Sequence, residues 1–535
     1  MTSLIGASII TCAILYGVLA AILVFVCIVL EVPVFIAFLI CIAVILLQYF
    51  LSPWITDLIQ RWLYKTDFNT PMPAYLESFI QQVCTENNMK YPRMGFINDG
   101  APNAFTYGHT KNDARIVLTR GIFDLLTEDE VKAVVAHELG HAVHYDMLLM
   151  TMVQLVPMVL YGIYDVLIHA SKESSSDKSD YTAVVAIVAY ILYLATQYLI
   201  LWLSRVREYY ADEFSANTTR NPNALASALV NIGFGLSTRE KSKETLGSVT
   251  AESTLGIFDT KSSKSMAVTC YKNGQIVKDN IKNAMKWELW NVWAKFYELG
   301  STHPLTSKRL KRLGELAKSQ GQQPFVDFDL ERPESYVDDF FRELFISIMP
   351  TLGFIACLIV ALIQAVAESE QALMWVGIAC VVAMVLSCLK YLYTHPRREY
   401  HEANTAGLLG EVKVSMIKSI PAELKGRIIG KGDPGCIFDE NFVLQDNTGI
   451  LFLDYNQPLW IINKVFALFK SHQYIDQYVT VKGWYRRNMV PFFELYSMEI
   501  NGETKKCYNY IFGWIWRIVL LVLAVALTVA CVVML

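Results

Sequence analysis

Charged residues are scarce in this chain of 535 residues, in which Asp, Glu, Lys and Arg make up 18%, against about 25% in typical soluble proteins. The net charge is −4, so no basic excess favours binding to nucleic acid. The 11 cysteines include no CxxC pair, so neither a zinc ribbon nor a disulfide framework is indicated. Apolar residues, in contrast, reach 54%. These proportions exclude a single soluble globule and a disordered chain.

Long apolar runs account for the apolar excess. Seven runs approach or exceed the roughly 20 residues that a helix needs to span a bilayer. No soluble core of this size needs so many, so we predict a mainly α-helical, multi-pass membrane protein with about seven transmembrane helices. The first run is too long for the apolar core of a signal peptide, and we interpret it as retained. The runs cover residues 3–29, 33–51, 147–168, 182–203, 344–366, 371–393 and 511–535.

The distribution of basic residues predicts the orientation in the membrane. Seven crossings put the long segments 52–146, 204–343 and 394–510 on one side and only short loops on the other. Of the 46 Lys and Arg residues, the short loops hold two, Lys172 and Lys178. By the positive-inside rule the long segments are cytoplasmic, which agrees with their unpaired cysteines. We therefore expect an integral protein of the cell membrane.

A metal-binding motif, HELGH, begins at His137. His137 and His141 are four residues apart, so on a helix they share one face and can bind one Zn²⁺ per chain. Glu138 can take a proton from the metal-bound water. Thr127 and Glu130 form a capping box that predicts where this helix begins.

A third zinc ligand is expected from the topology. The segment SRVREYYAD begins at Ser204, directly after the fourth apolar run. The short loop between the third and fourth runs favours an antiparallel helix pair. Extension of both helices would bring Glu208 to the metal and let Asp212 orient a ligand histidine. His144 remains an alternative ligand, although three ligands in one straight row on a helix suit a tetrahedral ion badly.

These motifs, with Asp146 and a Thr-His-Pro sequence at Thr302, resemble the HtpX-type membrane zinc endopeptidases, relatives of the CAAX prenyl endopeptidases. The resemblance spans about residues 1–340 and implies a cytoplasmic gluzincin-type zinc peptidase domain. It implies that Asp146 contacts the metal ligands without binding the metal itself. It also implies cleavage of membrane or misfolded proteins. The implied zinc ligands are His137, His141 and Glu208, with Glu138 as general base.

The resemblance implies two further functional segments. Asn103, Ala104 and Phe105 would form an edge strand with which an extended substrate pairs through main-chain bonds. An ordinary structural hairpin remains the alternative for this segment. His303 would donate a hydrogen bond to the oxyanion of the tetrahedral intermediate, and a plain His-Pro turn remains the alternative there.

The chain departs from compact family members in a polar insertion at 236–285 and in everything after residue 343. Short β-rich runs separated by Gly and Asp-Asn-Thr-Gly turns predict a small all-β, OB-like domain near the C-terminus. It lacks a strong basic patch, which favours a regulatory or partner-binding role over nucleic-acid binding. The predicted parts are two transmembrane helices (1–51), two peptidase segments (52–146 and 204–343), two transmembrane hairpins (147–203 and 344–393), the β domain (394–510) and a final transmembrane helix (511–535).

The sequence thus predicts a zinc-dependent endopeptidase that acts in quality control on membrane or misfolded proteins at the cytoplasmic face. Its expected partners are polypeptide substrates and the lipid bilayer, and not nucleic acid. Two alternatives stay open, a prenyl-CAAX endopeptidase and a non-enzymatic scaffold with a vestigial metal site. The intact Glu138 speaks against the scaffold, since a structural metal site needs no base.

The basic asymmetry makes the orientation testable. A cysteine placed in the loop 169–181 should be labelled from outside the cell by an impermeant thiol reagent, whereas a cysteine placed near Lys308 should be protected. The reverse labelling pattern would overturn the orientation and the cytoplasmic substrates with it.

Overall fold

The computed structural model divides the chain into two compact units, one of Met1–Ser263 with Tyr297–Phe328 and one of Lys264–Phe296 with Asp329–Leu535. Residues 30–32, the short loop between the first two predicted runs, and residues 239–270 of the predicted insertion lie outside the described residues. The structure describes residues 4–29, 34–173, 178–238, 271–272, 275–276, 278–328, 331–367, 371–396, 399–432, 440–469 and 471–534.

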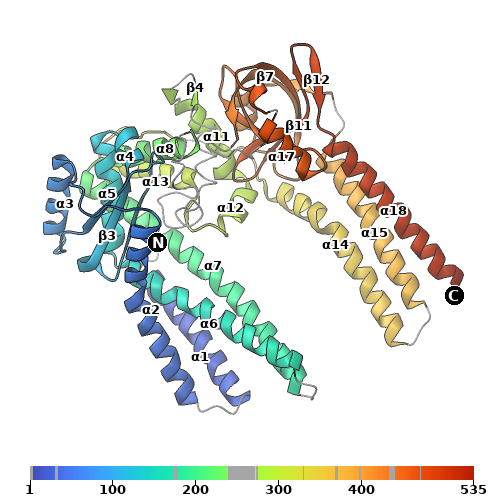
Figure 1. The fold of residues 1–535 in the computed structure, drawn as a ribbon, viewed down its shortest axis with the longest axis horizontal. Coiled ribbons are helices and arrows are strands. Elements are labelled where there is room, and N and C mark those ends of the chain that lie inside the picture. The colour runs from blue at the N-terminus through green and yellow to red at the C-terminus, as the bar shows by residue number, and fades with distance from the viewer. Residues whose placement is uncertain are drawn as a thin grey trace. The chain divides into compact units, whose positions relative to one another are not determined.

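Four long helices of the first unit run side by side (Figure 1). They are α1 (Leu4–Val29), α2 (Val34–Trp62), α6 (Asp146–Glu173) and α7 (Lys178–Thr219). Buried side chains of α1, α6 and α7 pack together in one apolar cluster that includes Leu15, Val156 and Leu203. The α7 helix has 42 residues and is therefore about 63 Å long. This is about twice the thickness of the bilayer core, so part of α7 extends beyond the membrane.

A small sheet and short helices form the rest of the first unit. The strand order is β1-β3-β2, with β1 parallel and β2 antiparallel to β3. The expected hairpin before the HELGH helix is therefore present, and β2 is an edge strand. The strands are β1 (Arg93–Ile97), β2 (Ala104–Gly108) and β3 (Ala114–Thr119), with η1 (Lys111–Asp113) between the last two. The helices are α3 (Ala74–Glu86), α4 (Arg120–Leu125), α5 (Glu128–Val143), α8 (Pro222–Thr238) and α13 (Thr306–Ser319).

The HELGH helix is α5, and it begins as expected. Thr127 and Glu130 form the capping box, each side chain bonding the backbone N–H of the other. Its C-terminal end differs from a helix that continues into the membrane. His144 is the C-cap, and Tyr145 has φ 59°, a left-handed conformation that ends the helix. The chain then turns, and α6 starts at Asp146.

The second unit contains three long helices and a β-barrel. Strands β7 to β11 form a closed ring, because β10 pairs with both β11 and β7. The predicted small all-β domain is thus a five-stranded barrel. The long helices are α14 (Val337–Val366), α15 (Ala372–Thr394) and α18 (Asn509–Met534). The barrel strands are β7 (Ile420–Lys431), β8 (Phe442–Gln445), β9 (Ile450–Asp454), β10 (Tyr478–Arg487) and β11 (Pro491–Ile500).

Smaller elements complete the second unit. Strands β6 (His401–Glu402) and β12 (Glu503–Lys506) extend the barrel sheet, and β4 (Tyr271–Lys272) pairs with β5 (Gln275–Ile276). Arg487 fixes α11 to the barrel by donating to the carbonyl of Ala284. The helices are α11 (Lys278–Trp290), α12 (Val292–Glu298, which crosses the boundary between the units), α16 (Thr405–Gly410), α17 (Trp460–Phe469) and η2 (Ser471–Tyr474).

Among the described residues, five helices are long and apolar enough to cross a membrane. They account for five of the seven predicted spans. The other two predicted spans fall on α1 and α2, which have 26 and 29 residues, and crossing by these two helices stays a prediction. The five segments are Asp146–His169, Thr182–Thr219, Val337–Val366, Ala372–Thr394 and Asn509–Val533. The chain is therefore a multi-pass membrane protein.

Gly140 lets α5 and α7 approach closely. A Cβ atom at Gly140 would lie 3.2 Å from the Cα of Ala211 and 3.2 Å from the Cβ of Phe214. Further along this contact, Ser215 Oγ donates a hydrogen bond of 2.6 Å to the carbonyl of Ala133. The small residue in the motif thus sets the distance between the helix that carries the histidines and the helix that carries Glu208.

Gly140→Leu should therefore separate α5 from α7. We expect a loss of about 1–3 kcal/mol in the free energy of unfolding, as is typical of overpacking, measured by thermal unfolding in detergent. Gly162→Leu on α6 is the matched control, because a Cβ there meets nothing within 4 Å. Equal stabilities of the two variants would contradict the close helix contact.

Candidate metal centre

Three side chains from two helices converge on one point. His137 Nε2 and His141 Nε2 are 3.2 Å apart. Glu208 of α7 places Oε2 3.7 Å from His137 Nε2 and Oε1 3.5 Å from His141 Nε2. The three potential ligand atoms lie within 4.8 Å of one another. The geometry thus brings together the two motif histidines and the carboxylate that was expected from the topology.

Each histidine has a carboxylate behind it. Asp212 Oδ1 lies 3.1 Å from His137 Nδ1, and Asp146 Oδ2 lies 2.6 Å from His141 Nδ1. A carboxylate at Nδ1 favours the tautomer with the proton on that nitrogen, which leaves Nε2 free as a ligand. The turn at Tyr145 is what brings Asp146 back to His141.

Two buried arginines, which the sequence reasoning did not single out, balance these carboxylates. Arg309 of α13 donates two hydrogen bonds to Asp212, of 2.9 and 2.7 Å, and lies 3.4 Å from Glu208. Arg207 forms an ion pair with Asp146. Burial alone would lower the pKa of Arg309, but Asp212 and Glu208 raise it above its ordinary value.

The sequence does carry a signal for Arg309. On α13, Arg309 shares a face with the apolar residues Leu310, Leu313 and Ala317, all of which are buried. A cation in the apolar stripe of an amphipathic helix indicates a buried partner.

Thr106 of β2 holds Glu138. Its hydroxyl lies 2.8 Å from Glu138 Oε2 and 3.1 Å from the Glu138 carbonyl. The sequence reasoning did not identify Thr106, because nothing local to β2 reveals that this strand edge meets α5. Both residues line a cavity of about 210 Å³ that also contains His137, His141 and Glu208. Glu138 therefore faces the same space as the three potential ligands.

Of the expected oxyanion donor and substrate-binding residues, His303 lines this cavity, and Asn103, Ala104 and Phe105 are not among its lining residues. His303 Nδ1 lies 3.1 Å from Glu208 Oε2. Ala104 and Phe105 lie in edge strand β2 with buried side chains, and the backbone N–H of Ala104 donates a hydrogen bond of 2.9 Å to Asn103 Oδ1. Asn103 precedes the strand, and its backbone N–H is bonded to Thr119 Oγ1 at 2.7 Å.

His144, the alternative third ligand, faces away from the centre. Its ring packs against Phe214 and Tyr210 of α7, with centroid distances of 5.8 and 6.3 Å, and lines a separate cavity with Glu213. Burial, with the nearby His141 and Arg207, lowers the pKa of His144. The turn that ends α5 at this residue removes it from the row of ligands.

The residues at the centre fit a metal ion. Two imidazoles and one carboxylate are a common donor set for catalytic zinc. Glu208 Oε2 is buried, and no contact to it within the described part of the chain has hydrogen-bond geometry, although His303 Nδ1 and Arg309 lie 3.1 and 3.4 Å away.

Comparison with known proteins agrees with this arrangement. Residues 72–317 match the sequence model described as peptidase family M48, a range that contains all three potential ligands. An HtpX protease homologue from Methanothermobacter thermautotrophicus is 35% identical over 204 residues, which are 38% of this chain and 75% of the relative. A homologue from Aeropyrum pernix is 29% identical over 289 residues, covering 53% of this chain and 86% of the relative.

A solved structure gives a weaker likeness. The crystal structure of S. mikatae Ste24p aligns with 42% of this chain and 57% of its own, at 17% identity and a TM-score of 0.31.

The contact between Asp212 and His137 predicts that Asp212 strengthens metal binding. Asp212→Asn keeps the shape but weakens the bond to His137 and leaves Arg309 with a neutral partner, so metal affinity should fall by roughly 10–100-fold. Glu213→Gln is the matched control, because the neighbouring Glu213 pairs with Arg312 on the surface. Metal titration of both purified variants measures the effect, and equal affinities would contradict the role of Asp212.

Proposed function

From the premise that this chain belongs to peptidase family M48, as an HtpX-type membrane metalloprotease, we propose that it is a zinc-dependent endopeptidase that cleaves membrane or misfolded proteins at the cytoplasmic face. One observation carries the proposal. Glu138, a potential general base, faces a cavity shared with two imidazoles and a carboxylate. This combination is the one that metal-assisted peptide hydrolysis requires.

The proposed roles follow from the contacts at the centre. His137, His141 and Glu208 would hold the zinc ion. When bound, the ion would lower the pKa of a coordinated water and polarise the scissile carbonyl. Glu138, oriented by Thr106, accepts a proton from the attacking water and delivers it to the leaving amine. His303, on the wall of the same cavity, donates to the oxyanion.

Substrate binding is proposed at the free edge of β2. An extended peptide would add to this edge through main-chain hydrogen bonds, a mode that tolerates many sequences. Such tolerance suits a protease for misfolded proteins. The cavity that contains Glu138 and the three potential ligands is also lined by Met147, Met150 and Gln154. These residues lie at the start of α6, a candidate membrane span. The closeness of the cavity to the membrane supports membrane proteins as substrates.

Glu138 is proposed as the general base and Glu208 as a metal ligand, and glutamine substitution distinguishes these two roles. Glu138→Gln removes the base without touching the ligands, so activity should fall by roughly 10²–10⁴-fold while zinc stays bound. Glu208→Gln should lose activity and also bind zinc more weakly, as should His137→Ala and His141→Ala. Zinc analysis and peptide cleavage with and without chelator, on the purified full chain in detergent, measure both effects.

Asp129→Asn serves as the control, because Asp129 is exposed on the same helix as Glu138. It should keep both zinc and activity. Full zinc affinity together with substantial activity in Glu208→Gln would place the third ligand elsewhere. Cleavage that depends on an isoprenyl group in the substrate would favour a prenyl-CAAX endopeptidase instead.

A further inference from the structure

The α17 helix of the barrel presents an apolar face outward. Ile461, Val465 and Phe469 are spaced four apart, so they share one side of the helix, and their exposed fractions are 61%, 50% and 79%. Trp460 and Ile462, beside them, are exposed by 69% and 47%. A helix on the surface of a soluble domain normally carries polar residues on its outer side. Large contiguous apolar surfaces of this kind mark interaction sites.

The exposed face does not result from loose packing, because the inner side of α17 is firmly held. Phe466 stacks on Tyr455 with a centroid distance of 4.2 Å and on Tyr474 at 5.6 Å. Asn463 accepts a hydrogen bond of 2.9 Å from the backbone of Gln457. The carbonyl of Ala467 near the helix end accepts from Lys431 at 2.9 Å. The apolar outer side is therefore a fixed feature of the barrel.

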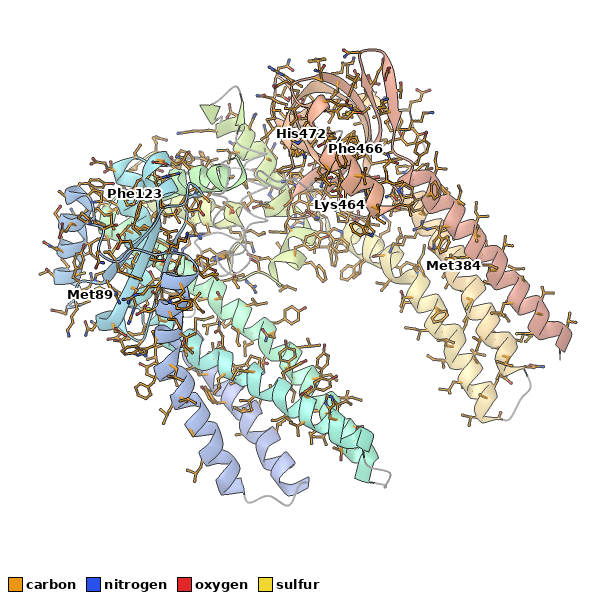
Figure 2. All side chains as sticks on the ribbon, in the orientation of Figure 1. Met89, Phe123, Met384, Lys464, Phe466 and His472 are labelled. Carbon is orange, nitrogen blue, oxygen red and sulfur yellow. The ribbon has the colours of Figure 1, made fainter. Side chains whose placement is uncertain are left out.

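Hydrogen bonds place this helix where the chain enters its last membrane span. The side chain of Gln457, just before α17, donates to the carbonyl of Lys506 and accepts from the backbone N–H of Tyr508, both at 3.1 Å. The next residue begins α18. Figure 2 shows Phe466 and Lys464 at the side of the barrel from which α15 and α18 extend. The apolar face of α17 thus lies near the level of the membrane surface.

The barrel is also fixed to the neighbouring span, α15. Arg486 of β10 donates a hydrogen bond of 2.9 Å to the carbonyl of Thr394, the last residue of α15. His395, which follows, lies 3.2 Å from Glu494 of β11. Two spans therefore hold the barrel, and α17 with it, at one height and orientation relative to the bilayer.

We propose that α17 is an interfacial helix that lies in the headgroup–acyl boundary of the bilayer with Ile461, Val465 and Phe469 directed into the lipid. The occupant of the apolar face is thus lipid rather than protein. With 10 residues the helix is about 15 Å long, too short to span a membrane. A short helix with an apolar outer side and a tryptophan at one end is typical of helices that lie in the interface. Anchored in this way, the barrel would be a membrane-surface module.

A photoreactive residue identifies what covers this face. We would replace Val465 by p-benzoylphenylalanine in the full chain, reconstitute it in vesicles of phosphatidylcholine and phosphatidylglycerol, irradiate it and analyse the adducts by mass spectrometry. We expect phospholipid adducts at position 465, roughly tenfold more abundant than at Asn501, because an interfacial helix buries its apolar face by about 5–10 Å. Asn501 is the control in the exposed β11–β12 turn.

The probe at Leu523, exposed on membrane helix α18, is the positive control for lipid adducts. Adducts at 465 to polypeptide, from a second copy or from elsewhere in the chain, would overturn the proposal. So would the absence of adducts at 465 when position 523 gives them. A second variant with the probe at Ile461 should repeat the result if the first folds poorly.

Discussion

The buried ion pair between Asp212 and Arg309 is the interaction on which the metal centre depends. Both side chains are 1% exposed, and moving two charges out of water costs several kcal/mol per ion unless good geometry offsets it. The bidentate contact, with bonds of 2.9 and 2.7 Å, supplies that geometry. Asp212 also contacts His137 of α5, and Arg309 also contacts Glu208 of α7. This one ion pair therefore positions a potential ligand on each of the two helices.

The length of α7 connects this pair to the membrane. The helix is continuous over Lys178–Thr219, so its apolar part and the part that carries Glu208 and Asp212 form one rigid body. The contact at Gly140 then sets the separation of α5 from α7. The position of Glu208 relative to the two histidines therefore depends on the membrane helix α7 and on the close contact at Gly140.

The second unit shows the same use of buried charge for another purpose. Burial raises the pKa of Glu494, but His395 and Arg486 outweigh it and lower this pKa to about 2. The carboxylate thus stays ionised at neutral pH and ties the end of α15 to two barrel strands. A barrel fixed in this way keeps α17 at a constant position relative to the membrane helix α15.

The sequence by itself determined what depends on local spacing. The HELGH helix, the β hairpin before it and the apolar runs follow from periods of two or four residues or from run length. The capping box follows from the three-residue spacing of Thr127 and Glu130, and Glu208 followed from the order of the helices. Tertiary structure alone decided the partners that come from distant segments. Arg309 reaches Asp212 across 97 residues, and Thr106 reaches Glu138 across 32. The turn at Tyr145, which brings Asp146 to His141 and removes His144 from the row of ligands, also belongs to tertiary structure, because tyrosine has no intrinsic preference for the left-handed conformation that it adopts there.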